Sequence, residues 1–421
     1  MVEYKPRCIE QIIRDNLAVF GAVYINGPKW CGKTTTAKTF ANSIADLSNP
    51  REKDILKAQA EVDITLVMKG EKPRLFDEWQ VIPELWDAVR HDADTHEDEG
   101  RYLLTGSVNV DWGQVEHSGA GRIATVTMLP MSLFESGDSS GTVSLRGLFS
   151  GKKDVEGTSN YSVSDITALI VRGGWPKIIG KTPSAAHLLL KGYCDTLLER
   201  DISTVDGKQR DPVRMRMLLR SLARSESQSV ENTHILSDVT GGTGVGMHIN
   251  TLGDYLNALE NLFVVMDLPA WCPKLRSKTA IRTSKVRHLI DPSIGAYFLN
   301  ASVEDLLNDP WTLGFYFESM VVRDLRAYAS AMGGEVLHYH DGDGLEADAI
   351  VHLWDGRWAA FEMKLPHKDI EEGAKNLLRL SEKIDASVEN TPIFLAVITP
   401  HGAAYRRNDG VYVIPVGCLG P

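Results

Sequence analysis

Residues 27–34 read GPKWCGKT and match the pattern G-x-x-x-x-G-K-[ST] at every fixed position. The run AVFGAVYI at 18–25 precedes it and is apolar and β-rich, whereas TTTAKTFA at 34–41 carries its apolar residues on one side. The sequence therefore predicts a strand, a phosphate-binding loop and a helix in that order. The alternative is a glycine-containing strand-to-helix turn that binds nothing.

The residue types in this loop suit a nucleotide phosphate. Gly27 and Gly32 would let the backbone curl so that its N–H groups and the start of the helix face an anion. Lys33 would neutralise charge on the β- and γ-phosphates, and the Thr34 hydroxyl would be a ligand of Mg²⁺. We therefore expect ATP and Mg²⁺ as the bound groups. The predicted ATP-binding residues are Gly27, Pro28, Lys29, Trp30, Cys31, Gly32, Lys33, Thr34 and Thr35.

Two further short strands are predicted to end beside this loop. The run RLFDEWQ at 74–80 contains Asp77 and Glu78, where hydrolytic phosphate-loop enzymes place a metal-side carboxylate and a carboxylate that polarises the attacking water. The strand at 101–107 stops in small polar residues, and parallel strand ends lie side by side, so Ser107 (or Thr105) would reach the γ-phosphate or its water. ATP hydrolysis is therefore predicted. The alternative is a strand that merely ends in acidic turn residues.

Composition indicates a multidomain protein. The 421 residues, of which 43% are hydrophobic, are enough for about two to four domains. The five cysteines form no C-x-x-C pair, so neither a disulfide framework nor a zinc site is predicted, as expected in a reducing cytoplasm. The N-terminus is charged, and no run of about 18 apolar residues occurs, so we expect neither export nor a membrane span.

The pattern of apolar runs predicts an α/β protein with several domains. Residues 1–145 alternate strand-like and helix-like segments and would form a doubly wound ATPase core. A Gly/Ser-rich boundary lies within 136–160, and residues 146–205 are predicted to form a helical lid. A winged-helix-like domain is predicted over 206–300, from amphipathic helices at 215–223 and 251–260, a Gly-rich turn around 241–246 and a strand-like run at 262–266.

A basic stretch follows these predicted helices. It contains six cations and no carboxylate, although the chain's formal net charge of −11 argues mildly against binding nucleic acid through bulk charge. We expect this stretch to contact DNA phosphates, because the helix at 251–260 carries acidic residues and no Arg or Lys. The alternative is a solvated surface loop. The six residues are Lys274, Arg276, Lys278, Arg282, Lys285 and Arg287.

The C-terminal region, residues 301–421, carries a second group of polar residues. Two predicted strands within 346–365 are joined by a tight Asp-Gly turn, with Asp348 near the start of the first and Glu362 and Lys364 on one face of the second. With Glu318 on the preceding helix, they resemble the core of PD-(D/E)xK nucleases, in which carboxylates hold a divalent metal and the lysine orients water. The alternatives are a surface charge pair, or a nuclease-like fold that binds without cleaving.

These motifs occur in one series with several weaker ones. The series is GPKWCGKT, LFDEWQ (75–80), LLTGS (103–107), GAGRIATVTMLPMS (119–132), GGWP (173–176), LERD (198–201) and FESM (317–320). It spans nearly the whole chain and resembles the prokaryotic AAA-type (AAA_14) ATPases that carry a C-terminal domain of unknown function, DUF4143. The chain departs from the commoner pattern of that family at Trp30, Cys31 and Trp175.

The resemblance implies roles for particular residues. Lys33 and Thr34 would bind phosphate and Mg²⁺, Asp77 and Glu78 would serve the metal and the water, and Ser107 would be the sensor of the γ-phosphate. It also implies a homo-oligomeric ring, with a hexamer favoured, in which Arg122 reaches the γ-phosphate of the next subunit. The alternative for Arg122 is a surface arginine or a partner in a local salt bridge.

The predicted fold is thus an α/β P-loop AAA-type ATPase with a helical lid, a winged-helix segment and a C-terminal nuclease-like domain. Two functions follow from it. The first is an ATP-driven motor or switch that engages DNA through its C-terminal half. The second is an ATP-controlled module that docks protein partners and carries a nuclease-like domain without cleavage.

Overall fold

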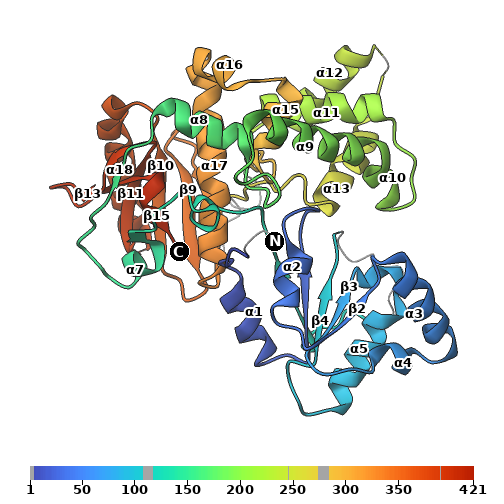
Figure 1. Ribbon diagram of the computed structural model, residues 1–421. Coiled ribbons are helices and arrows are strands. Elements are labelled where there is room, and N and C mark those ends of the chain that lie inside the picture. Colours follow the sequence, from blue (N-terminus) through green and yellow to red (C-terminus); the bar gives the residue numbers. More distant parts are fainter. Residues whose placement is uncertain (1–3, 108–116, 245, 274–283, 389) are drawn as a thin grey trace.

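A computed structural model describes residues 4–107, 117–244, 246–273, 284–388 and 390–421. They form an N-terminal sheet domain, a group of helices in the middle of the chain, and a C-terminal sheet domain. Figure 1 shows these parts in blue, green to yellow, and orange to red. The predicted α/β class is confirmed, because parallel or mixed sheets stand at both ends of a helical middle part.

Within the described residues the N-terminal domain is built on a five-stranded parallel sheet in the order β2-β3-β4-β1-β5. Its strands are β1 (Ala22–Asn26), β2 (Ser43–Asp46), β3 (Arg74–Asp77), β4 (Tyr102–Thr105) and β5 (Ile123–Thr127). The helices around it are α1 (Glu10–Leu17), α2 (Lys33–Lys38), α3 (Pro50–Val62), α4 (Ile64–Met68) and α5 (Glu84–Thr95), with a 3-10 turn η1 (Trp79–Val81). All residues of β1, β3 and β4 are buried, as expected for parallel strands covered on both faces. The carboxyl ends of β1, β3 and β4 therefore meet at one edge, where ligands bind in open α/β sheets.

The segment after this sheet joins the C-terminal domain. It contains α6 (Leu133–Ser136), β6 (Val143–Ser144), α7 (Leu145–Phe149) and β7 (Thr158–Ser159). Strand β6 pairs with β15 (Leu419–Gly420), β7 pairs with β12 (Gly402–Ala403), and Leu133 and Leu145 lie in one apolar cluster with Phe317. The Gly/Ser-rich segment therefore packs with the C-terminal domain on both sides of the boundary predicted at residue 145, because its short strands β6 and β7 pair with strands near the end of the chain.

Most helices of the middle part share one core, whereas α8 and α16 pack in the apolar cluster of the C-terminal domain. Its elements are α8 (Val163–Arg172), α9 (Pro183–Thr196), the π-helical η2 (Leu197–Asp201), α10 (Ile202–Thr204), α11 (Pro212–Arg224), α12 (Asn232–Thr243), α13 (Ile249–Asn261), α15 (Pro292–Leu299) and α16 (Val303–Asn308). Leu190 of α9, Leu218 of α11 and Leu252 of α13 share a single apolar cluster. The predicted boundary near residue 205, between a lid and a winged helix, therefore does not separate two cores. Leu190 of α9 is buried against the helices that follow, whereas Leu188 is exposed.

The predicted winged-helix pattern has a counterpart in this part of the chain. Helices α11 and α13 contain the predicted helices at 215–223 and 251–260, but α12 stands between them where only a turn was predicted. After α13, two antiparallel bridges join Val265 to Leu289 and Leu268 to Val286. Helix α12 escaped prediction because it has few apolar residues and two consecutive glycines.

The C-terminal domain is a mixed sheet between two long helices. Over the described residues the sheet has six strands in the order β13-β14-β11-β10-β9-β8. They are β8 (Gly334–His340), β9 (Glu346–Leu353), β10 (Trp358–Met363), β11 (Phe394–Thr399), β13 (Tyr405–Arg406) and β14 (Tyr412–Pro415). Short 3-10 turns η3 (His367–Asp369) and η4 (Val416–Cys418) flank them. The predicted hairpin of two strands is confirmed, because β9 and β10 pair antiparallel across the Asp-Gly turn.

Helices α17 (Pro310–Ser330) and α18 (Ile370–Val388) cover opposite faces of this sheet. Val351 packs in one apolar cluster with Phe317 of α17, whereas its neighbour Ile350 packs in another with Leu377 of α18. This split follows from the alternation of side chains along β9.

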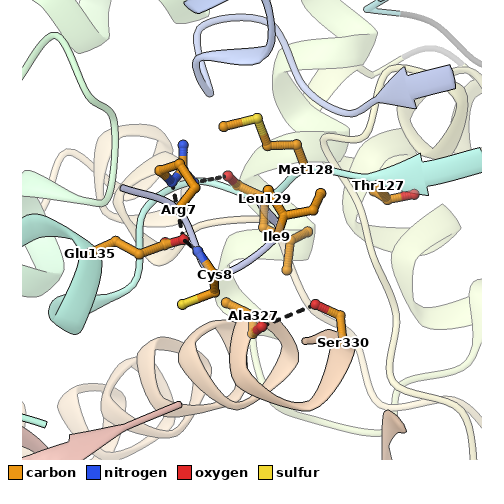
Figure 2. Close-up of a pocket in the computed structure, with 9 residues that line it drawn as sticks. All are labelled: Arg7, Cys8, Ile9, Thr127, Met128, Leu129, Glu135, Ala327 and Ser330. Atoms are coloured by element: carbon orange, nitrogen blue, oxygen red, sulfur yellow. Dashed lines mark hydrogen bonds and ion pairs between the residues drawn. The ribbon is translucent and has the colours of Figure 1, made fainter. Parts of the chain in front are cut away.

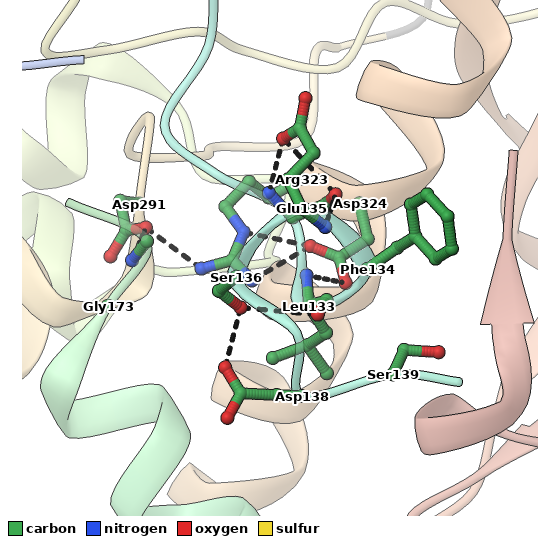
Figure 3. A network of polar contacts seen from close by, with 12 residues as sticks. Leu133, Phe134, Glu135, Ser136, Asp138, Ser139, Gly173, Asp291, Arg323 and Asp324 are labelled. Carbon is green, nitrogen blue, oxygen red and sulfur yellow. Dashed lines mark hydrogen bonds and ion pairs between the residues drawn. The ribbon is translucent and has the colours of Figure 1, made fainter. Parts of the chain in front are cut away.

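A buried polar network lies where the three parts meet, as Figure 3 shows. The guanidinium of Arg323 on α17 donates to Asp291 Oδ2 at 2.9 Å and to Asp324 Oδ1 at 2.8 Å. Asp291 also accepts from Gly174 N, and Asp324 accepts from Leu133 N. The side chain of Arg323 is only 3% exposed, so its charge depends on these two carboxylates.

Replacing Arg323 should therefore destabilise the whole chain. Arg323→Leu leaves Asp291 and Asp324 buried without their cation, which should lower the free energy of unfolding by about 3–5 kcal/mol. Arg224→Leu is the matched control, because Arg224 pairs with Asp238 at the surface and that pair should contribute less than about 1 kcal/mol. Urea unfolding of the two variants measures the difference. Equal losses would contradict a structural role for the network.

Candidate nucleotide site

The predicted phosphate-binding loop stands between β1 and α2. Gly27 and Gly32 have φ values of 135° and 103°, in the region that favours glycine. A Cβ at Gly27 would lie 2.2 Å from the carbonyl oxygen of Met128, so the loop also needs glycine there for space. The Lys33 side chain is buried, and its Nζ donates to Gly27 O at 2.9 Å and to Pro28 O at 2.7 Å. The loop therefore curls around the ammonium group.

The ends of three strands bring together the residues predicted to handle the metal. Thr34 Oγ1 donates to Asp77 Oδ1 at 2.8 Å, and Thr105 Oγ1 donates to the same oxygen at 2.5 Å. Asp77 is 2% exposed, so these hydroxyls solvate its carboxylate in place of water. A hydroxyl and a carboxylate at this edge form a donor set that suits Mg²⁺ beside phosphate oxygens.

Glu78 lies next to this pair in a strained backbone conformation. Its φ of 59° and ψ of 50° are left-handed, which is uncommon outside glycine and often marks functional sites. Its carboxylate accepts from Gln80 Nε2 at 2.5 Å and from Ser107 Oγ at 3.3 Å. The structure thus brings both predicted sensor alternatives to the site: Ser107 contacts Glu78, and Thr105 contacts Asp77. Gln80 was missed, since no spacing rule distinguishes it in a turn.

Arg7 is a further residue of the site, and no sequence pattern predicts its role. Its Nη1 donates to Cys31 O within the loop at 2.7 Å, and its Nη2 donates to Leu129 O at 2.7 Å. Its Nε also lies 3.1 Å from Glu135 Oε1 in a buried ion pair. Figure 2 shows Arg7 between Leu129 and Glu135, beside a cavity of about 10 Å³ that is too small for a nucleotide. Arg7 therefore fastens the phosphate loop to α6.

The remaining loop residues face the helical middle part. Lys29 Nζ lies 2.6 Å from Asp201 Oδ1, and the Trp30 ring stacks on Tyr193. Cys31 and Pro28 are buried, whereas Thr35 is exposed on α2. Cys31 thus belongs to the apolar core beneath the loop, whereas Thr35 lies at the surface.

Arg122 lies at the other edge of the N-terminal sheet. It directly precedes β5, whose first residue Ile123 pairs with Ala22 at the start of β1, so it is far from its own phosphate loop. Its half-exposed side chain forms an ion pair with Asp94 of α5. Within one chain Arg122 is therefore a partner in a local salt bridge, which is the alternative role given above. Its action on a neighbouring subunit stays a prediction.

The C-terminal polar residues gather at one end of β9 and β10. Lys364 Nζ lies 2.6 Å from Glu362 Oε2, and Asp348 Oδ2 accepts from Met363 N at 2.7 Å. Burial, followed by the charges of Asp348 and Glu362, raises the pKa of Glu318 well above its ordinary value. Burial likewise raises the pKa of Asp348 and of Glu362. The charges of Asp348, Glu362 and Lys364 thus all act on the Glu318 carboxyl.

The predicted metal at Glu318, Asp348 and Glu362 stays a prediction. In the described part of the chain, no three His, Cys, Asp or Glu residues are already placed to hold a metal ion together. Lys364 neutralises one oxygen of Glu362, and a backbone N–H occupies one oxygen of Asp348. The other oxygen of Glu362 is buried and has no hydrogen-bond partner among the described residues.

The basic stretch is described only at its end. Lys274, Arg276, Lys278 and Arg282 lie outside the described residues. Lys285 Nζ lies 3.9 Å from Glu260, and Arg287 pairs with the buried carboxylate of Asp267. The expectation of six cations without a nearby carboxylate is therefore wrong for these two, because the fold brings acidic residues from α13 and the chain after it beside them.

Three family models match the chain, each over part of its length. Residues 20–136 match an AAA domain, residues 163–305 a domain of unknown function, DUF8612, and residues 313–419 another, DUF4143. The sheet order, the phosphate loop and this match define the N-terminal part as a P-loop ATPase domain of the AAA type. The predicted DUF4143 region is confirmed, and the helical middle part coincides largely with DUF8612.

Comparison with solved structures gave distant similarities. A Walker-type ATPase of Pyrococcus abyssi has 15% identity and a TM-score of 0.43, over 69% of this chain and 94% of that chain. Drosophila ORC bound to DNA has 10% identity and a TM-score of 0.22, over 67% and 89% of the two chains. A signal transduction ATPase with numerous domains from Pyrococcus horikoshii has 12% identity and a TM-score of 0.19, over 93% and 56%. The comparison with curated proteins gave no match. Among the described helices, none is long and apolar enough to cross a membrane.

The coupled carboxyls predict a pH-dependent stability. A raised pKa in the folded state means that the folded chain keeps a proton that the unfolded chain has released. The resulting stabilisation is full below the ordinary glutamate pKa of about 4.3 and is lost as pH rises through the folded pKa. Glu318→Gln cannot ionise, so its stability relative to the wild type should increase as the pH rises from about 5 to about 8.

Lys364→Met is the contrasting variant, because the Lys364 charge lowers the pKa of all three carboxyls. Its stability should fall more steeply with pH than that of the wild type. Urea unfolding at each pH measures both effects. If the difference in free energy of unfolding between Glu318→Gln and the wild type does not change with pH, the pKa of Glu318 is not raised in the folded chain.

Proposed function

We propose that the chain binds ATP with Mg²⁺ between its phosphate loop and the ends of β3 and β4, and that it hydrolyses ATP there. The observation that carries this proposal is the meeting of Lys33, Thr34, Asp77 and Glu78 at one edge of a parallel sheet. The AAA domain match over residues 20–136 supports it.

Each residue has a role that follows from its contacts. Lys33 would exchange the carbonyl oxygens of Gly27 and Pro28 for phosphate oxygens, because an anionic acceptor makes a stronger hydrogen bond with an ammonium group. Thr34 and Asp77 would hold Mg²⁺, which neutralises charge on the phosphates. Glu78, oriented by Gln80 and Ser107, would accept a hydrogen bond from the attacking water and polarise it.

The wider proposal is a ring-forming motor or switch, with a hexamer favoured. Arg122 would act in trans, which its half-exposed position away from its own loop permits once Asp94 releases it. DNA engagement would fall to the basic stretch, chiefly to Lys274, Arg276, Lys278 and Arg282. The ring and the role of Arg122 rest on the sequence resemblance, and DNA engagement rests on the charge of the basic stretch.

A second candidate function concerns the C-terminal domain. The ion pair between Lys364 and Glu362 favours the alternative of a nuclease-like module that docks partners without cleavage. In this alternative, ATP binding controls the docking.

Two variants separate phosphate binding from catalysis. Lys33→Ala should weaken ATP binding, because it removes the cation inside the loop. Glu78→Gln should keep ATP binding and lower turnover by about 10²-fold or more, because it removes the base that acts on water. Lys38→Ala, at the exposed end of the same helix, is the matched control and should change neither.

Calorimetric titration of ATP and a phosphate-release assay measure the two properties. Wild-type turnover by Glu78→Gln would contradict the role of Glu78. A wild-type chain that does not bind ATP would overturn the whole proposal.

A further inference from the structure

Two motifs of the sequence, LERD at 198–201 and GGWP at 173–176, have no part in the proposed chemistry, yet both reach the phosphate loop. Asp201 ends η2, and its side chain is 9% exposed. Its Oδ1 lies 2.6 Å from Lys29 Nζ, which belongs to the loop itself. The Lys29 side chain is 43% exposed, so it is the buried carboxylate of Asp201 that needs this partner, and the ion pair holds the Lys29 ammonium group beside η2.

The next loop residue is held by an aromatic ring. Trp30 has a φ of 73°, an outlier for a bulky side chain. Its ring stacks on Tyr193 of α9, with centroids 5.5 Å apart and an interplanar angle of 30°. Such backbone strain persists only where the surrounding structure holds it. Tyr193 is therefore part of what keeps the loop in its observed shape.

Tyr193 is itself firmly placed. It is 6% exposed, and its ring packs against Trp175 of the GGWP motif with centroids 4.8 Å apart. Trp175 is fully buried, and its Nε1 donates to Ser293 Oγ at 3.0 Å. Trp30 and Trp175 thus contact the same tyrosine, so Tyr193 links the phosphate loop to a buried residue of the helical middle part.

We infer that Tyr193 and Asp201 are positioning residues for the phosphate loop, supplied by the helical middle part. They hold Trp30 and Lys29 so that the loop keeps the shape that receives ATP, and bound ATP in turn stabilises α9 and η2. This reciprocity follows because any contact that favours one state of the loop is coupled to every ligand that favours the same state. The inference rests on the proposed function, since it assumes that the loop binds ATP.

The test compares ATP affinity in the full-length chain. Tyr193→Ala should weaken ATP binding by on the order of tenfold, with KM for ATP rising more than kcat falls, because the loop loses its support while Glu78 stays in place. Tyr193→Phe keeps the ring and should bind like the wild type. Asp201→Asn should weaken binding by a smaller factor, because it removes the charge beside Lys29. Tyr255→Ala is the matched control, as it removes a buried tyrosine of the same core whose hydroxyl accepts from Asp211 N and not from the loop, and it should leave the affinity unchanged.

Amide hydrogen exchange gives a second reading that a loss of stability alone would not produce. ATP should slow exchange in α9 and η2 of the wild type and of Tyr255→Ala, but not of Tyr193→Ala. Wild-type affinity in Tyr193→Ala, with α9 still protected by ATP, would overturn the inference and leave the proposed function intact. Failure of the wild type to bind ATP would overturn both, so the two failures are distinguishable.

Discussion

The buried guanidinium of Arg323 is the interaction on which the arrangement of the three parts depends. An ionised group removed from water requires a nearly complete set of partners, and Arg323 finds them in Asp291 from the helical middle part and Asp324 from its own helix. Asp324 in turn accepts the backbone N–H of Leu133, at the start of the segment that leaves the N-terminal sheet. One charge thus ties α17 to both other parts. Hydrophobic contacts tolerate small displacements, whereas these hydrogen bonds specify one relative placement.

The same segment carries this placement to the phosphate loop. Two residues beyond Leu133, Glu135 pairs with Arg7 and accepts the backbone N–H of Cys8. Arg7 then donates to the carbonyl of Cys31 inside the loop. A continuous series of short polar contacts therefore leads from α17 to the loop, although contact alone does not establish energetic coupling. It explains why the loop residues outside the G-x-x-x-x-G-K-[ST] positions are mostly buried or paired with distant parts of the chain.

The sequence predicted those features that depend on neighbouring residues. The phosphate loop and the carboxylates after β3 follow from local patterns, and alignment of parallel strand ends brings Thr34, Asp77 and Thr105 together. Arg7, Gln80 and Asp201 escaped prediction because each acts through a tertiary contact that no periodicity encodes. The pairing of Val143 with Leu419, close to the boundary predicted at residue 145, could not be predicted for the same reason, since it depends on the far end of the chain. In the C-terminal domain the ion pair of Lys364 with Glu362 could not be predicted from the spacing, because it depends on the orientation of both side chains.

The phosphate loop is held from two sides by different chemistry. On one side the Arg7 guanidinium donates to the Cys31 carbonyl and forms an ion pair with Glu135. On the other side the Lys29 ammonium pairs with Asp201, and the Trp30 ring stacks on Tyr193. Trp175 connects this second side to Ser293, and Ser293 donates to Asp291, the carboxylate that also receives Arg323. The two routes therefore meet at the network around Arg323. The phosphate loop thus has two contact routes to this junction, one through Arg7 and α6 and one through Tyr193, Trp175 and Ser293.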